Sequence, residues 1–244
     1  RVRVPRQQQA RNAAMEHRTR IIADVFQHEI HGLTVGLGGQ FQMPANQRQP
    51  FHIQALRFEQ LLSRPLQHVN QIAGQRPAIA HDLGALKRAV IRTLLVDSGD
   101  DPALAEPAFE VFHRERQRVT LFDDALETLQ FLAARWPLVA LSNGNADIAQ
   151  TGVGAFFTSA VSAASVGVAK PDARIFQAGA AAGGVAPDEV LHIGDDAELD
   201  AVGALAVGMQ VAWLSRDGDA WPAAHPERPH AVVHDLRMLC RLLD

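Results

Sequence analysis

Short apolar stretches alternate with amphipathic stretches along the chain from about residue 119 onward. The apolar stretches have the length of buried strands and cover residues 137–141, 160–164, 190–193 and 210–214. Helical spacing of apolar residues fills the stretches between and after them, 122–132, 147–154, 172–182 and 199–206. This alternation predicts an α/β fold with a doubly wound, Rossmann-like parallel sheet, right-handed crossovers and helices on both faces.

The first part of the chain has a different pattern. Its opening residues, 1–20, are rich in Arg and Gln without an apolar period, which indicates an irregular start. Further on, helical periods dominate, so we expect a small helical unit rather than more sheet. The expected elements are a short strand over 20–26 that ends near Asp24, a helix over 54–71 that Pro65 interrupts, and helices over 82–96 and 101–116.

Composition narrows the class of protein. Residues 1–79 carry a formal charge of +6 and residues 80–244 carry −10, so the 244-residue chain has a net charge of −4. The chain therefore lacks the excess of positive charge that is typical of nucleic-acid-binding proteins. No apolar run approaches the roughly 18 residues that a membrane span needs. Cys240, the only cysteine, is expected in a buried helix, excludes an internal disulfide and fits a reducing compartment. We therefore expect a cytoplasmic protein with neither nucleic acid nor membrane as a partner.

Two adjacent carboxylates follow the apolar run 190–193. Gly194 ends the run, and Asp195 and Asp196 come next. In open α/β sheets the ligand site lies outside the carboxyl ends of the strands, so this pair is expected at the site. Neighbouring carboxylates repel unless a cation or a proton relieves them, and hard oxygen ligands suit Mg²⁺. The alternative is a solvated turn in which an Asp caps the next helix.

Two further strand ends carry polar groups. Ser142, Asn143, Gly144 and Asn145 follow the strand over 137–141 and offer a hydroxyl and backbone N–H donors. Lys170 precedes a proline that can open a helix, and it is one of only two lysines among 23 basic residues. A lysine in an Arg-rich chain suggests a need for a compact point charge, although a solvated helix start is the simpler alternative. Hydroxyl, ammonium and carboxylates at neighbouring strand ends together predict a phosphate site.

These motifs, in this order and spacing, resemble the haloacid dehalogenase (HAD) superfamily. Leu141-Ser142-Asn143, Lys170-Pro171, and Gly194-Asp195-Asp196 with Asp200 are similar to its second, third and fourth motifs. Residues 80–244 carry the resemblance, and the stretch from Ala140 to Trp213 is similar to bacterial flavin mononucleotide and riboflavin-pathway phosphatases. The resemblance implies a Mg²⁺-dependent phosphatase that forms an aspartyl-phosphate, with a helical cap. It divides the chain into an irregular segment with the first core strand (1–34), a cap (35–117) and an α/β core (118–244).

The resemblance also implies a role for each residue. Ser142 and Lys170 would be catalytic, and both would bind the phosphoryl group together with Asn143 and Gly144. Asp195 and Asp196 would hold Mg²⁺. Asp200 would support this set of residues.

One motif of the family is missing. Its Asp-x-Asp pattern, which supplies the nucleophile and the general acid, does not occur in residues 1–79. Asp24 stands at about the expected place, but Phe26 occupies the position of the second aspartate. A lone Asp24 would leave turnover impaired, since general acid–base help contributes about 10²–10⁴-fold. The explanations are a corrupted N-terminal sequence, a divergent non-catalytic member, or a nucleophile from elsewhere in the chain.

Three functions therefore compete. The first is a phosphatase for a small phosphomonoester such as flavin mononucleotide or a sugar- or nucleotide-like phosphate. The second is a catalytically dead protein on the same scaffold that binds phosphate or a partner. The third is a 2-haloacid dehalogenase, which needs no metal and so has little use for adjacent carboxylates. The chain is expected to be a monomer or a homodimer, and its physiological substrate is left open.

Overall fold

The computed structural model describes residues 20–23 and 65–244. The chain divides into two compact units, one formed by Arg1–Gln27 with Arg116–Asp244 and the other by His28–Glu115. The expected boundaries at residues 34 and 117 stay a prediction, because residues 24–64 lie outside the described part.

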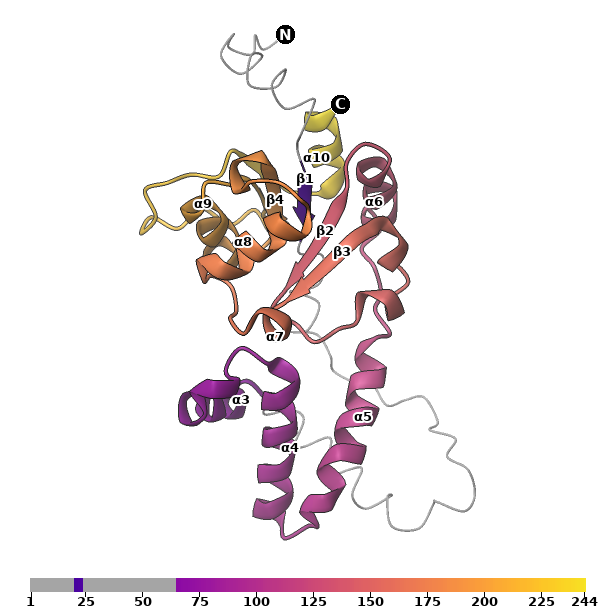
Figure 1. Ribbon diagram of the computed structural model, residues 1–244, viewed down its shortest axis with the longest axis vertical. Coiled ribbons are helices and arrows are strands. Elements are labelled where there is room, and N and C mark those ends of the chain that lie inside the picture. Colours follow the sequence, from indigo (N-terminus) through magenta and orange to yellow (C-terminus); the bar gives the residue numbers. More distant parts are fainter. Residues whose placement is uncertain (1–19, 24–64) are drawn as a thin grey trace. The chain divides into compact units, whose positions relative to one another are not determined.

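A six-stranded sheet forms the first unit, and every pair of neighbouring strands is parallel. The strand order is β3-β2-β1-β4-β5-β6, so the direction in which strands are added reverses at β1 (Figure 1). The parallel sheet predicted from the sequence is confirmed, although β6 was missed. The strands are β1 (Arg20–Ala23), β2 (Leu138–Ser142), β3 (Phe157–Ser162), β4 (Val190–Gly194), β5 (Gln210–Leu214) and β6 (Ala231–Val233).

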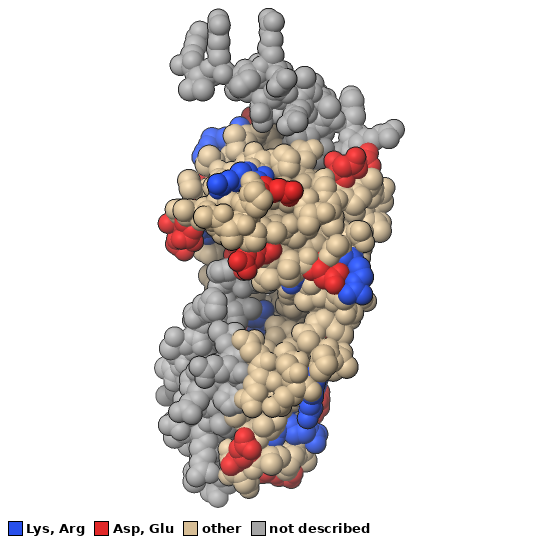
Figure 2. Space-filling view, turned by 90° about the vertical axis from the view of Figure 1, so that its left-hand side faces the viewer, with Lys and Arg blue, Asp and Glu red and all other residues tan. Residues whose placement is uncertain are grey.

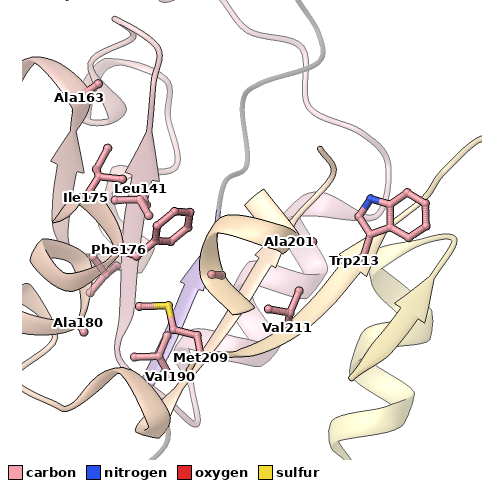
Figure 3. Packing of buried hydrophobic residues seen from close by; sticks show 12 residues of the cluster. Leu141, Ala163, Ile175, Phe176, Ala180, Val190, Ala201, Met209, Val211 and Trp213 are labelled. Atoms are coloured by element: carbon pink, nitrogen blue, oxygen red, sulfur yellow. The ribbon is translucent and has the colours of Figure 1, made fainter. Parts of the chain in front are cut away.

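Helices cover both faces of this sheet, and successive strand residues point to opposite faces. On one face, Val139, Val190 and Val211 pack with α8 (Ala173–Ala182) and α9 (Gly203–Ala206), around Phe176 and Met209 (Figure 3). On the other face, Leu138, Leu191 and Ala212 pack with residues of α6 (Ala125–Ala133) and α10 (Leu236–Leu243). Burial on both faces explains why the strands are continuously apolar rather than alternating.

Three predicted elements differ in detail. The stretch 147–154 is not one helix but two 3₁₀ turns, η5 (Ile148–Gln150) and η6 (Gly154–Phe156), because Gly152 between them has a positive φ of 84°. The predicted strand 160–164 ends at Ser162, whose side chain caps a short helix, α7 (Ala163–Val166). The helix predicted over 199–206 is a π-helix, η8 (Ala197–Val202), followed by α9.

The described part of the second unit is helical, as predicted. Pro65 is the first residue of the first described helix, since proline is tolerated in a first turn. The part of the predicted helix before Pro65 lies outside the described residues. Asp82 caps the next helix through Ala85 N, at 2.9 Å. The elements are α3 (Pro65–Gln75), η3 (Pro77–Ile79), α4 (Leu83–Ser98), η4 (Pro102–Leu104) and α5 (Ala105–Arg116).

The structure also bears on the expectations for surface charge, for a membrane span and for Cys240. On the face shown in Figure 2, acidic and basic side chains of the described residues are interspersed rather than gathered by sign. In the described ranges, every helix is too short or too polar to cross a membrane. Cys240 lies in helix α10, as predicted, but it is only partly buried and its Sγ is 3.6 Å from Thr128 Oγ1.

Helix α6 allows a direct test of the core. The sequence pattern places Leu126, Leu129 and Leu132 on one face, but Leu126 is 47% exposed whereas Leu129 is 3% exposed. We expect Leu129→Ala to lower the free energy of unfolding by about 2–5 kcal/mol because it leaves a cavity. The matched change Leu126→Ala should shift it by less than about 0.5 kcal/mol. Urea unfolding of both variants measures the difference, and equal losses would contradict this packing.

Candidate functional site

The candidate site lies at β1, where the order in which strands are added to the sheet reverses. Strands β2 and β4 flank β1, with Ala23 opposite Ala140 on one side and Ile193 on the other. In doubly wound sheets a crevice opens outside the carboxyl ends of the strands at this switch point, and ligands bind there. Strand β2 ends at Ser142, and β4 ends at Gly194, directly before Asp195.

A buried ion pair lies beside these strand ends. Lys170 Nζ is 2.5 Å from Asp200 Oδ1, and both side chains are fully buried. Burial by itself raises the pKa of Asp200, but the charge of Lys170 and hydrogen bonds to the carboxylate outweigh it, so this pKa lies well below its usual range. Asp200 is therefore ionised at neutral pH, and the pair contributes no net charge.

His192 of strand β4 borders the pair. Its imidazole is fully buried and meets the Phe176 ring edge-on, with ring centroids 5.3 Å apart. Its Nε2 is 3.6 Å from Asp200 Oδ1, which is too long for a hydrogen bond. Neither ring nitrogen has a hydrogen-bond partner among the described residues. His192 lies within the apolar run 190–193, whose pattern predicts a strand and no contact with Asp200.

Gly194 allows Asp200 to approach the end of β4. A Cβ on Gly194 would lie 2.4 Å from Asp200 Cβ and 2.6 Å from its Oδ2, closer than any side chain tolerates. The second oxygen, Oδ2, accepts a hydrogen bond from Asp196 N at 3.1 Å. Asp200 thus holds both Lys170 and the backbone of the turn after β4.

The two adjacent carboxylates have different surroundings. Asp196 Oδ1 accepts hydrogen bonds from Glu198 N and Leu199 N, so this side chain caps η8. Asp195 is half-buried, and its backbone carbonyl accepts a hydrogen bond from Trp213 Nε1 at 2.8 Å. Trp213, which is buried in the core, therefore also fixes the backbone of the turn that carries Asp195.

The loop after β2 is tied to the loop of Lys170. Asn143 Oδ1 accepts a hydrogen bond from Lys170 N at 2.7 Å, and Asn143 Nδ2 donates to Lys170 O at 3.1 Å. Gly144 N donates to Ser142 Oγ at 2.9 Å. Asn143 thus uses its amide to hold the Lys170 backbone, and the Ser142 hydroxyl lies at the turn of the loop.

Together these contacts show which predicted residues the fold brings together. Lys170 contacts Asn143 and Asp200, Asp200 contacts the turn of Asp195 and Asp196, and Ser142 and Gly144 share one loop with Asn143. Asp24, the candidate nucleophile, lies outside the described residues, as does Phe26. The sequence pattern does not predict the contacts of His192 and Trp213, since nothing in the local pattern marks them.

The donor set fits Mg²⁺ better than a metal held by protein alone. In the described residues, no group of three or more His, Cys, Asp or Glu side chains is placed to hold a metal. Mg²⁺ requires less, since one or two carboxylates, waters and a substrate phosphate complete its shell. Asp195 contributes a half-buried carboxylate directly after β4, whereas Asp196 uses Oδ1 as a helix cap.

Comparisons with known proteins identify one family. The model of the family described as haloacid dehalogenase-like hydrolase matches residues 40–208, so the similarity begins well before residue 80. The riboflavin-pathway enzyme 5-amino-6-(5-phospho-D-ribitylamino)uracil phosphatase YigB of Escherichia coli is 31% identical over 73% of this chain and 78% of its own. Phosphoserine phosphatase of Thermus thermophilus is 32% identical over 66% of this chain and 64% of its own.

A solved structure also resembles the whole fold. The 2-haloacid dehalogenase of Pseudomonas syringae is 26% identical, has a TM-score of 0.71, and the alignment covers 92% of this chain and 98% of that one.

Removing the charge of Asp200 tests the buried pair. We expect Asp200→Asn to lower the free energy of unfolding by about 3–5 kcal/mol, because it leaves the Lys170 ammonium buried without a counter-charge. Asp172→Asn is the matched control: Asp172 pairs with Arg174 at the surface and caps α8, a role that Asn fills as well. That change should cost less than about 1 kcal/mol. Chemical unfolding compares them, and similar losses would refute the buried pair.

The same pair predicts a pH dependence. Because the pKa of Asp200 is lowered in the folded chain, the stability it contributes is present above the unfolded value, about 3.9. That contribution is lost as pH falls below this value towards the folded pKa. The wild-type protein should therefore exceed Asp200→Asn in stability at pH 7 and lose this advantage progressively below about pH 4. A difference that stays constant from pH 7 to pH 3 would contradict the lowered pKa.

Proposed function

The chain belongs to the haloacid dehalogenase-like hydrolase family, and from this premise we propose that it is a Mg²⁺-dependent phosphatase of a small phosphomonoester such as flavin mononucleotide. The observation that carries the proposal is the buried Lys170–Asp200 pair, joined through Asn143 to the Ser142 loop and through Asp196 N to the turn of Asp195. In this proposal the hydroxyl, the ammonium and the carboxylates act together at the switch point of the sheet. The two phosphatase relatives support the reaction class.

Each residue has a distinct task in this proposal. Ser142 and the backbone N–H groups of its loop bind oxygens of the phosphoryl group, and Lys170 orients the attacking carboxylate and the phosphate. Mg²⁺, held by Asp195 with a contribution from Asp196, would neutralise charge on the phosphate. Asp200 keeps Lys170 charged and fixed. The nucleophile is expected to be Asp24, which directly follows the last residue of β1 in sequence.

Phosphate release tests the proposal directly. We expect the chain to release phosphate from flavin mononucleotide or another small monoester with Mg²⁺, and to lose this activity in EDTA and in Asp195→Asn. Asp24→Asn should abolish it as well, and the lack of a second aspartate at Phe26 should keep the rate about 10²–10⁴-fold below that of a complete site. Asp188→Asn, an exposed Asp in the turn η7 (Pro187–Glu189), is the matched control and should be silent.

Two results would replace the proposal. If the folded chain binds phosphate but releases no phosphate from any monoester, the chain is a non-catalytic binding protein. Release of chloride from 2-chloropropionate in EDTA would establish a haloacid dehalogenase, the second candidate, which the similarity to the Pseudomonas syringae enzyme favours. The half-buried carboxylate of Asp195 at the end of β4 favours the phosphatase, because a metal-free displacement has little use for it.

The remaining expectations belong to the same proposal. A small phosphate ester is the partner, and neither nucleic acid nor membrane is required for the reaction. The single cysteine supports a reducing, cytoplasmic location. A monomer or a homodimer is expected.

A further inference from the structure

Two consecutive residues at the end of α5 hold the loop that follows Ser142. Arg116 Nε donates a hydrogen bond to Asn145 Oδ1 at 2.9 Å. The buried Gln117 accepts a hydrogen bond through Oε1 from Asp147 N at 2.8 Å. Both residues belong to the same compact unit as the sheet. The guanidinium of Arg116 is therefore fixed relative to the Ser142 loop rather than free in solvent.

The guanidinium of Arg116 and the hydroxyl of Ser142 both lie close to Gly144. A Cβ built on Gly144 would be 3.0 Å from Ser142 Oγ and 3.5 Å from Arg116 Nη2. The hydroxyl and the guanidinium thus border one small space, and glycine at position 144 leaves that space open. An oxygen of a group bound by Ser142 would come close to Arg116.

The charges around Arg116 leave it available for an anion. Among the described residues no carboxylate pairs with it, and its hydrogen bond to Asn145 uses Nε rather than the two terminal nitrogens. Because Nε is a donor, it fixes the orientation of the Asn145 amide, and Asn145 Nδ2 is then buried without a partner in this part of the chain. Burial also lowers the pKa of Arg116, which an anion at the guanidinium would offset.

Binding of a phosphate ester requires a positive charge such as that of Arg116. Lys170 is the only lysine in the sheet unit, and its charge is balanced by the fully buried Asp200 at 2.5 Å. The pair as a whole therefore offers little net attraction to a dianion. A second cation beside the Ser142 loop would supply it, and a planar guanidinium suits phosphate oxygens.

We propose that Arg116 is a substrate-binding residue whose guanidinium, oriented by Asn145, contacts an oxygen of the phosphate group held by Ser142. This inference rests on the proposed phosphate chemistry of the site but not on turnover. It assigns Asn145 as the positioning residue for Arg116. It also explains why residue 144 is a glycine, since a side chain there would enter the space between the hydroxyl and the guanidinium.

Binding of inorganic phosphate to the full chain, measured by calorimetry with Mg²⁺ at low and high salt, tests the proposal. Loss of one charge-assisted hydrogen bond predicts binding about 10- to 100-fold weaker for Arg116→Ala, with a smaller dependence on salt. Arg116→Lys keeps the charge and should recover part of the affinity. Arg114→Ala, an exposed arginine of the same helix α5, is the matched control and should bind as the wild type does.

The outcomes separate this inference from the proposed function. Equal phosphate binding by wild type and Arg116→Ala would overturn it, as would a wild type that binds no phosphate. Equally weak binding by the Ala and Lys variants with an unchanged salt dependence would mean that Arg116 only supports the loop, and would also overturn it. A wild type that releases no phosphate but whose phosphate binding depends on Arg116 would refute the phosphatase and support the inference.

Discussion

The buried ion pair of Lys170 and Asp200 is the interaction on which the site depends. It joins the loop before α8 to the helical turn after β4, two segments that are 30 residues apart in sequence. Two buried charges are tolerated only as a pair, so the two segments are held in one arrangement. Gly194 is required for the same reason, since a side chain there would displace Asp200. Through Asn143 and Asp196 N the constraint reaches both strand ends that carry the proposed chemistry.

Because this pair has no net charge, other groups of the proposed site must attract the phosphate. A lysine whose charge is balanced can orient a phosphate but attracts it weakly, so the attraction has to come from other groups. Ser142 and the loop N–H groups supply neutral donors, Asp195 is suited to a divalent cation, and Arg116 is the cation that we propose for the phosphate itself. Trp213 holds the backbone of the turn that carries Asp195, and Asn145 holds the side chain of Arg116.

Much of the fold could be predicted from the sequence because its signals are local. An apolar run that ends in Gly194 and two carboxylates marks both a strand and its carboxyl end, and the helix caps Asp82 and Asp172 confirm predicted helix starts. Strand β6 was not predicted because a strand of three residues is too short to show a hydrophobic period. Leu126 was misplaced because helical spacing alone does not tell which edge of an apolar face is covered. Lys170–Asp200, His192–Phe176 and Arg116–Asn145 are contacts between distant segments, which no local pattern encodes.

A crystal structure of the chain with Mg²⁺ and inorganic phosphate is the most direct test of this account. It should place the phosphate between Ser142, Lys170 and Arg116, with the cation on Asp195 and Lys170 still paired with Asp200. Phosphate bound away from Ser142, or a Lys170 side chain separated from Asp200 in the complex, would contradict the claim that this buried pair organises a phosphate site.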